Sequence, residues 1–167
     1  MKQQFKYLII HCTATRKGQM ITPETVRRWH IAPPPAGRGW SVVGYSDLIL
    51  LDGSRHQYVR HNGDIWIDPG EITNGVKGMN SVSRHVCYVG GLSTDGKKSE
   101  NTMTPEQSNS LQKIIREVLQ YAPAIEIAGH NQFSNKGCPS FWVPTYLREI
   151  GIQEKNIYKN NPYNYGK

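Results

Sequence analysis

The feature that most constrains this chain is a continuous apolar run, Tyr-Leu-Ile-Ile, at positions 7–10. A short run without polar alternation is typical of a strand buried inside a sheet. We therefore predict a buried strand over residues 6–14. Further strand-like segments occupy residues 42–51, 55–59, 84–89 and 124–128. The Asp52-Gly53 pair that separates the first two of these is a hairpin turn signal.

Helix signals alternate with these strands. Thr22 and Thr104 each precede a Pro-Glu pair, so each threonine is suited to cap a helix whose first residue is proline. The first helix should end before a run of three prolines. The second carries apolar residues at helical spacing between Leu111 and Leu119. A third, short helix is predicted over residues 144–150.

The interleaving of strands and helices predicts an α/β fold, a single domain with a central mixed β-sheet flanked by helices. The length of 167 residues suits one domain with one core. We assign residues 1–151 to this domain. Residues 152–167 are rich in Asn, Tyr and Lys, and we expect them to form a loosely ordered, polar C-terminal tail.

The apolar runs of the chain are shorter than the roughly 20 residues that a membrane-spanning helix needs, so we expect no membrane insertion. Residues 1–5 are mostly polar and lead directly into a short apolar run without a cleavage-site pattern, so we expect no signal peptide. Synthesis and folding are then expected in the cytoplasm. Three cysteines do not make a disulfide framework, and in a reducing compartment they would be buried thiols or metal ligands.

Three side chains with metal-binding chemistry lie at or after predicted strand ends. His11 lies near the end of the first strand, His130 follows the last strand, and Cys138 comes eight residues later. Strand ends in sheet proteins commonly converge on one rim, so we expect these side chains to meet. Two imidazoles and a thiolate suit zinc, and three ligands leave the open fourth position of a catalytic site. Cys12 is less suited, because adjacent strand residues point to opposite faces.

The remaining cysteines and histidines have a plainer interpretation. Cys12 and Cys87 are interpreted as buried thiols within apolar strands. A structural role is favoured for the other four histidines, which are His30, His56, His61 and His85. From spacing alone the zinc site is a hypothesis, because one histidine and one cysteine separated by seven residues form a weak pattern.

A series of short motifs runs in order from Ile9 to Phe141. They are Ile-Ile-His-Cys-Thr-Ala-Thr (9–15), Val-Gly-Tyr (43–45), Leu-Asp-Gly (51–53), Gly-Met-Asn-Ser (78–81), Val-Cys-Tyr-Val-Gly-Gly (86–91), Thr-Pro-Glu-Gln (104–107), Gly-His-Asn (129–131) and Lys-Gly-Cys-Pro-Ser-Phe (136–141). Each motif is weak alone, but their order is specific. On these residues the chain resembles the N-acetylmuramoyl-L-alanine amidases of the bacteriophage-lysozyme type, relatives of the peptidoglycan recognition proteins.

The resemblance implies one zinc ion held by His11, His130 and Cys138, and catalytic roles for Tyr45 and Lys136. The implied reaction is hydrolysis of the amide bond between N-acetylmuramic acid and L-alanine in bacterial peptidoglycan. Zinc lowers the pKa of water and polarises a carbonyl group. A nearby ammonium or phenol can stabilise the oxyanion of the tetrahedral intermediate. Which of Tyr45 and Lys136 transfers protons stays open.

The chain departs from the family pattern after the Gly-Tyr pair. Such amidases usually have a histidine and then an aromatic residue there, whereas this chain has Ser46 and Asp47. On a regular strand Asp47 would share a face with Tyr45. Its carboxylate could then accept a hydrogen bond from a zinc-ligating imidazole, or pair with a nearby cation. The irregular loop at residues 33–39 is expected to shape the substrate groove.

Two other functions compete with the amidase. Some relatives of this family bind peptidoglycan without cutting it and characteristically lack the zinc-binding cysteine, so Cys138 favours an enzyme. The net charge of +7 favours an anionic partner, which could be nucleic acid, a membrane surface or the cell wall. Lys and Arg are scattered, with no basic helix or aromatic platform, so no nucleic acid is expected.

The setting follows from the same resemblance. We expect a monomer that acts on the cell wall after release from the cytoplasm. A phage endolysin, a prophage remnant and a wall-recycling enzyme all fit the sequence.

Overall fold

A five-stranded mixed sheet forms the centre of the protein. The computed structural model describes residues 2–166, and the strand order in this sheet is β5-β4-β7-β2-β9. Its strands are β2 (Tyr7–Cys12), β4 (Asp47–Ile49), β5 (Arg55–Gln57), β7 (Ser83–Tyr88) and β9 (Glu126–Gly129). Only β5 runs antiparallel to its neighbour, across the predicted hairpin. The predicted α/β fold with a mixed sheet flanked by helices is confirmed.

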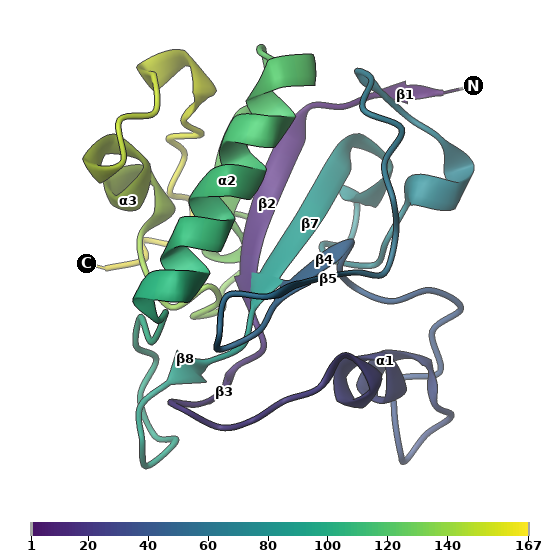
Figure 1. Ribbon diagram of the computed structural model, residues 1–167, viewed down its shortest axis with the longest axis vertical. Helices are drawn as coiled ribbons and strands as arrows, with labels where there is room; N and C mark the ends of the chain where they lie inside the picture. Colours follow the sequence, from purple (N-terminus) through teal and green to yellow (C-terminus); the bar gives the residue numbers. More distant parts are fainter. Residues whose placement is uncertain (1, 167) are drawn as a thin grey trace.

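The helices begin where the sequence places their caps. They are α1 (Pro23–Ile31), α2 (Pro105–Tyr121) and α3 (Val143–Glu149). Thr22 accepts a hydrogen bond from the Thr25 N–H at 3.2 Å. Thr104 and Gln107 form a complete capping box, with reciprocal hydrogen bonds of 3.1 and 3.0 Å. In Figure 1, α2 lies over one face of the sheet, with its axis roughly parallel to β2 and β7.

Strand alternation divides β2 between an apolar core and a polar face. Leu8, Ile10 and Cys12 belong to the large core cluster that also contains the buried side chains of α2. Those side chains are Leu111, Ile114, Ile115 and Val118. Burying such a side chain stabilises the fold by about 1.5–3 kcal/mol relative to exposing it. His11 points away from this core and lines a cleft on the other face of the sheet.

Several short elements were not predicted. Two small sheets pair β1 (Gln3–Gln4) with β6 (Trp66–Ile67) and β3 (Thr15–Arg16) with β8 (Gly91–Leu92). Single 3-10 turns are η1 (Pro69–Glu71), η2 (Asn80–Val82), η3 (His130–Gln132) and η4 (Glu154–Asn156). Two-residue strands and single turns carry too little periodic pattern to be recognised in a sequence.

The segment that follows α3 packs on the domain, so the expectation of loose order is wrong for its first part. Ile152 and Ile157 are buried in the large core cluster. The ring of Tyr158 stacks on Phe133 with centroids 5.0 Å apart. The side-chain amide of Gln132 donates to the Tyr158 carbonyl oxygen at 2.9 Å. Isolated apolar residues in a polar segment therefore anchor it, although they form no helical or strand period.

A buried network of charges joins the sheet to α2. Arg84 on β7 is only 2% exposed. Its guanidinium donates to Asp47 Oδ2 at 3.0 and 3.2 Å and to the Tyr121 hydroxyl at 2.6 Å. Asp47 Oδ1 accepts from Arg55 Nε at 2.7 Å, and Arg55 also pairs with Glu117 on α2. The buried Asp47 carboxylate therefore pairs with both arginines, and Glu117 shares Arg55 with it.

These contacts decide between the two roles considered for Asp47. It pairs with cations, and its carboxylate makes no hydrogen bond to a histidine within residues 2–166. Asp47 does not share a strand face with Tyr45, because the predicted strand over 42–51 is regular only from Asp47 to Ile49. Before it the backbone bonds to other parts of the chain, as when the Gly44 N–H donates to His30 Nδ1 at 3.1 Å.

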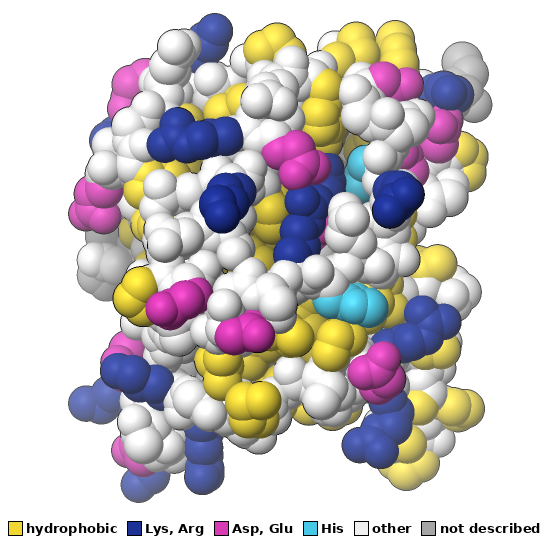
Figure 2. All heavy atoms as spheres, viewed as in Figure 1, with side chains coloured by type: hydrophobic (Ala, Val, Ile, Leu, Met, Phe, Trp, Pro, Cys, Tyr) yellow, Lys and Arg dark blue, Asp and Glu magenta, His cyan; other side chains and the backbone are white. Residues whose placement is uncertain are grey.

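Charged side chains are mixed on the surface. On the face shown in Figure 2, Lys and Arg are spread among Asp and Glu and do not gather into one basic stripe. Among the residues that the structure describes, no helix combines the length and apolar character needed to cross a membrane.

The buried network yields a stability prediction. Asp47→Asn keeps the shape of the side chain but leaves Arg84 buried without a counter-charge, so unfolding free energy should fall by about 3–5 kcal/mol. Denaturant unfolding followed by circular dichroism measures this. Arg148→Ala, which breaks an exposed pair with Glu154, is the matched control and should barely move the midpoint. Equal effects of both variants would contradict the assigned importance of the network.

Candidate metal centre

Parallel strand register brings two histidines together. Ile10 on β2 pairs with Gly129 on β9, so the next residues, His11 and His130, emerge side by side where the strands end. Their ring centroids are 4.8 Å apart. The expectation that these strand ends converge on one rim is confirmed.

The loop after η3 carries Cys138 back to the same place. The Cys12 N–H donates to Cys138 Sγ at 3.2 Å, which fixes the sulfur at the end of β2. Neighbouring loop residues are also held, since the Tyr88 hydroxyl donates to the Pro139 carbonyl oxygen at 2.7 Å and the Ser140 hydroxyl to the Gly91 carbonyl oxygen at 2.6 Å.

The three predicted ligand residues therefore converge. One nitrogen each from His11 and His130 and the sulfur of Cys138 lie within 4.8 Å of one another. His11 Nδ1 and Cys138 Sγ are 3.8 Å apart. Bonds of about 2.0–2.3 Å in a tetrahedral zinc site put ligand atoms roughly 3.5 Å from each other. Cys12 lies on the core side of β2, so its interpretation as a core thiol is confirmed, as is that of Cys87.

The chemistry of the donors also suits a metal ion. Burial and the neighbouring His130 hold the pKa of His11 well below its usual range. Burial and the nearby Lys136 lower the pKa of His130 to about 4. Both imidazoles are therefore neutral at neutral pH and have a lone pair to offer. Burial raises the pKa of the Cys138 thiol, and a bound cation is the kind of partner that stabilises a thiolate there.

Two histidines that were assigned structural roles belong to this region. His85 Nδ1 lies 3.0 Å from His11 Nε2, and burial lowers the pKa of His85 to about 3. His30 lines the cleft, and burial with the nearby Arg38 lowers its pKa to about 4. Sequence reasoning missed His85 because its proximity to His11 depends on the pairing of β2 with β7, which no local pattern encodes.

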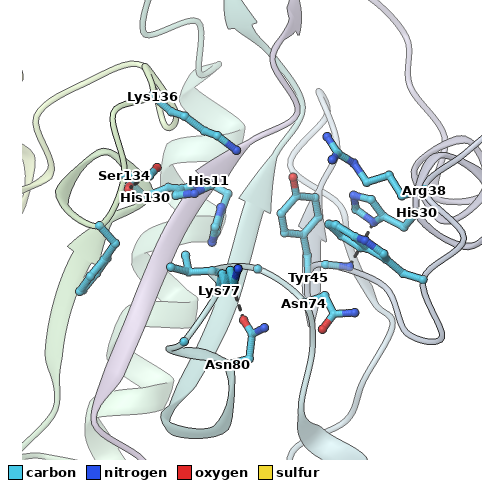
Figure 3. Close-up of a pocket in the computed structure, with 16 residues that line it drawn as sticks. His11, His30, Arg38, Tyr45, Asn74, Lys77, Asn80, His130, Ser134 and Lys136 are labelled. Carbon is cyan, nitrogen blue, oxygen red and sulfur yellow. Dashed lines mark hydrogen bonds between the residues drawn. The ribbon is translucent and has the colours of Figure 1, made fainter. Parts of the chain in front are cut away.

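A cleft of about 560 Å³ opens beside the candidate ligands. Figure 3 shows Lys136 reaching over His11 and His130 from one wall, with Tyr45 and His30 on the opposite wall. The ring of Tyr45 lies 5.2 Å from that of His11. Burial raises the pKa of Tyr45 well above its usual range, so its hydroxyl keeps its proton. Both predicted catalytic side chains therefore lie at the same cleft as the candidate ligands.

The cleft is positively charged at its rim. Arg38, Lys77 and Lys136 line it, and no carboxylate occurs among its described lining residues. Arg38 comes from the loop at residues 33–39, which was expected to shape the groove. A cleft lined by these cations suits a ligand group that carries or gains negative charge.

Comparison with known proteins agrees with the motifs. Residues 1–141 match the Amidase_2 family, described as N-acetylmuramoyl-L-alanine amidase. The endolysin of Enterobacteria phage K11 is 31% identical over 148 residues, which cover 86% of this chain and 89% of that protein.

Solved structures share the fold. The N-acetylmuramoyl-L-alanine amidase LysC from Clostridium intestinale URNW superposes with a TM-score of 0.67 at 18% identity, covering 90% of this chain and 87% of the other. Bumblebee PGRP-SA gives a TM-score of 0.67 at 17% identity, covering 94% and 86%. The match over residues 1–141 and the endolysin's identity across most of both chains show that this chain belongs to the N-acetylmuramoyl-L-alanine amidase family.

Proposed function

We propose that the protein is a zinc-dependent amidase that hydrolyses the bond between N-acetylmuramic acid and L-alanine in bacterial peptidoglycan. The observation that carries this proposal is the convergence of His11, His130 and Cys138 beside an open cleft, in a chain of the amidase family. When bound, zinc supplies a Lewis acid that polarises an amide carbonyl and lowers the pKa of water. The phage relatives are named endolysins, which supports the cell wall as the target.

The proposed roles of Lys136 and Tyr45 follow from their positions at the cleft. Lys136 projects a flexible ammonium over the candidate ligands, where it would stabilise the oxyanion of a tetrahedral intermediate. The Tyr45 hydroxyl keeps its proton and would donate a hydrogen bond or orient the attacking water. Each side chain sits on its own wall, so a scissile amide between them would be contacted from both sides.

The competing function is a module that binds peptidoglycan without cutting it. Such a module needs the cleft but no metal ligands. The sulfur of Cys138 accepts a hydrogen bond from the Cys12 N–H at the end of β2. It lies 3.8 Å from His11 Nδ1, a separation that suits two ligands of one metal ion. Binding alone does not need a thiol placed beside two imidazoles, so this arrangement favours the enzyme.

Product analysis tests the reaction. Digestion of purified peptidoglycan should release stem peptides with a free L-alanine amino terminus, identified by mass spectrometry. A strong chelator should abolish release, and added zinc should restore it. Stem peptides still joined to N-acetylmuramic acid would overturn the amidase. Full activity in protein that contains no zinc by elemental analysis would overturn the metal dependence.

A pair of cysteine variants tests the ligand assignment. Cys138→Ser should retain its fold but hold far less than one zinc per chain, because a serine hydroxyl stays protonated and binds zinc poorly. Cys12→Ser should keep its zinc and lose about 1–3 kcal/mol of unfolding free energy through a buried hydroxyl. Elemental analysis of the folded proteins measures both. The reverse pattern would show that the ligand and the core thiol have been exchanged.

Two further variants test the catalytic side chains. Tyr45→Phe and Lys136→Ala should each lower turnover by about 100-fold or more while leaving zinc content unchanged. Tyr58→Phe and Lys97→Ala are matched controls, since neither side chain lines the cleft, and both should turn over like the parent. Release of stem peptides under saturating substrate measures turnover. Parental turnover in Tyr45→Phe or Lys136→Ala would remove that residue from the mechanism.

A further inference from the structure

A second imidazole lies directly behind the candidate ligand His11. His11 Nε2 and His85 Nδ1 are 3.0 Å apart, and both residues are at most 1% exposed. The two rings are steeply inclined, at 64°, with centroids 5.1 Å apart. The ring edges of His11 and His85 therefore face each other at hydrogen-bond distance.

The position of Cys138 decides which nitrogen of His11 faces the candidate metal centre. Cys138 Sγ lies 3.8 Å from His11 Nδ1, so Nδ1 is the atom that would offer its lone pair. The proton of the neutral ring then sits on Nε2. A buried N–H needs an acceptor, and His85 Nδ1 is the atom within reach. For His85 to accept, its own proton must be on Nε2, a buried atom that has no hydrogen-bond partner among the described residues.

We propose that His85 is a positioning residue that accepts a hydrogen bond from His11 Nε2–H and so holds the tautomer and ring orientation that direct His11 Nδ1 at the metal. This inference rests on the proposed function, because it assigns His85 a purpose at the zinc centre. Ligand histidines commonly donate their second ring N–H to a carboxylate or a backbone carbonyl. Here a neutral ring replaces them and adds no negative charge beside the ligands.

His85 is itself held in place from three sides. Its backbone pairs with Ile9 across the parallel β2–β7 ladder. Its carbonyl oxygen accepts from both the N–H and the hydroxyl of Ser46, at 2.9 and 2.7 Å. Gly75 closes over the ring, and a Cβ atom at that position would lie 2.2 Å from His85 Cγ. The imidazole of His85 therefore has no room to rotate away from His11. A residue that orients another side chain must be confined in this way.

The tautomers can be observed in the parent protein loaded with zinc. Long-range ¹H–¹⁵N correlation spectra of the full chain should show His11 protonated at Nε2 and His85 protonated at Nε2 with a bare Nδ1. A proton on His85 Nδ1, or a His11 ring protonated at Nδ1, would overturn the proposal. This measurement needs no substitution, so a folding defect cannot obscure it.

Zinc affinity provides the second test, by competition with a chromophoric chelator. His85→Leu removes the acceptor and should weaken zinc binding by about 10–100-fold, the usual cost of losing such a partner. His85→Asn can place its amide oxygen near the position of Nδ1 and should recover most of this loss. Val86→Ala truncates the neighbouring core residue on the opposite face of β7 and controls for general destabilisation, so its zinc affinity should match the parent.

The comparison separates this inference from the proposed function. Zinc binding by the parent chain tests the metal centre, whereas the ratio of affinities among the variants tests His85. Parental affinity in His85→Leu, or an equal loss in His85→Leu and His85→Asn, would assign His85 to packing alone and overturn its positioning role.

Discussion

The parallel pairing of β2 with β9 is the constraint on which the candidate site depends. Because Ile10 lies opposite Gly129, His11 and His130 leave the sheet at the same level and on the same edge. The segment that follows β9 leaves no space for a side chain at Gly129, where a Cβ atom would lie 2.6 Å from the Asn131 side-chain oxygen and 2.8 Å from Val143 Cγ2. A slip of one residue would turn His11 into the apolar core. The sheet therefore sets the distance between the two imidazoles before any metal contributes.

The two faces of the sheet carry separate tasks. On one face α2 and α3 bury an extended apolar core that includes Leu8, Ile10 and Cys12. On the other face the same strand contributes His11 to a polar cleft. Most of the hydrophobic stabilisation thus comes from the face opposite His11, and of the candidate ligands Cys138 packs against the edge of that core. Loss of a ligand side chain on the cleft face should leave that core intact, so the proposed metal binding can be tested separately from folding.

The sequence predicted those features that depend on local period or on strand ends. Continuous apolar runs and capping residues located the main strands and all three helices, and the ends of two strands located His11 and His130. Features that depend on pairing between distant segments were missed. The proximity of His85 to His11 requires the β2–β7 register. The partners of Asp47 could not be predicted without knowing where β4 becomes regular. The anchoring of the last segment could not be predicted without knowing that Ile157 joins the large core cluster.

The charge of the side chains in the cleft differs between its floor and its rim. The imidazoles of His11 and His85 are buried, and that of His130 is partly buried. Their lowered pKa values keep all three neutral, so they present lone pairs or single N–H groups rather than positive charge. The cations Lys136 and Arg38 stand at the rim, where water solvates them. Their positive potential disfavours protonation of the imidazoles below, which keeps lone pairs available to a metal ion. The same potential favours an oxygen that gains negative charge between the walls. One distribution of charge therefore keeps the imidazoles neutral and favours the proposed oxyanion.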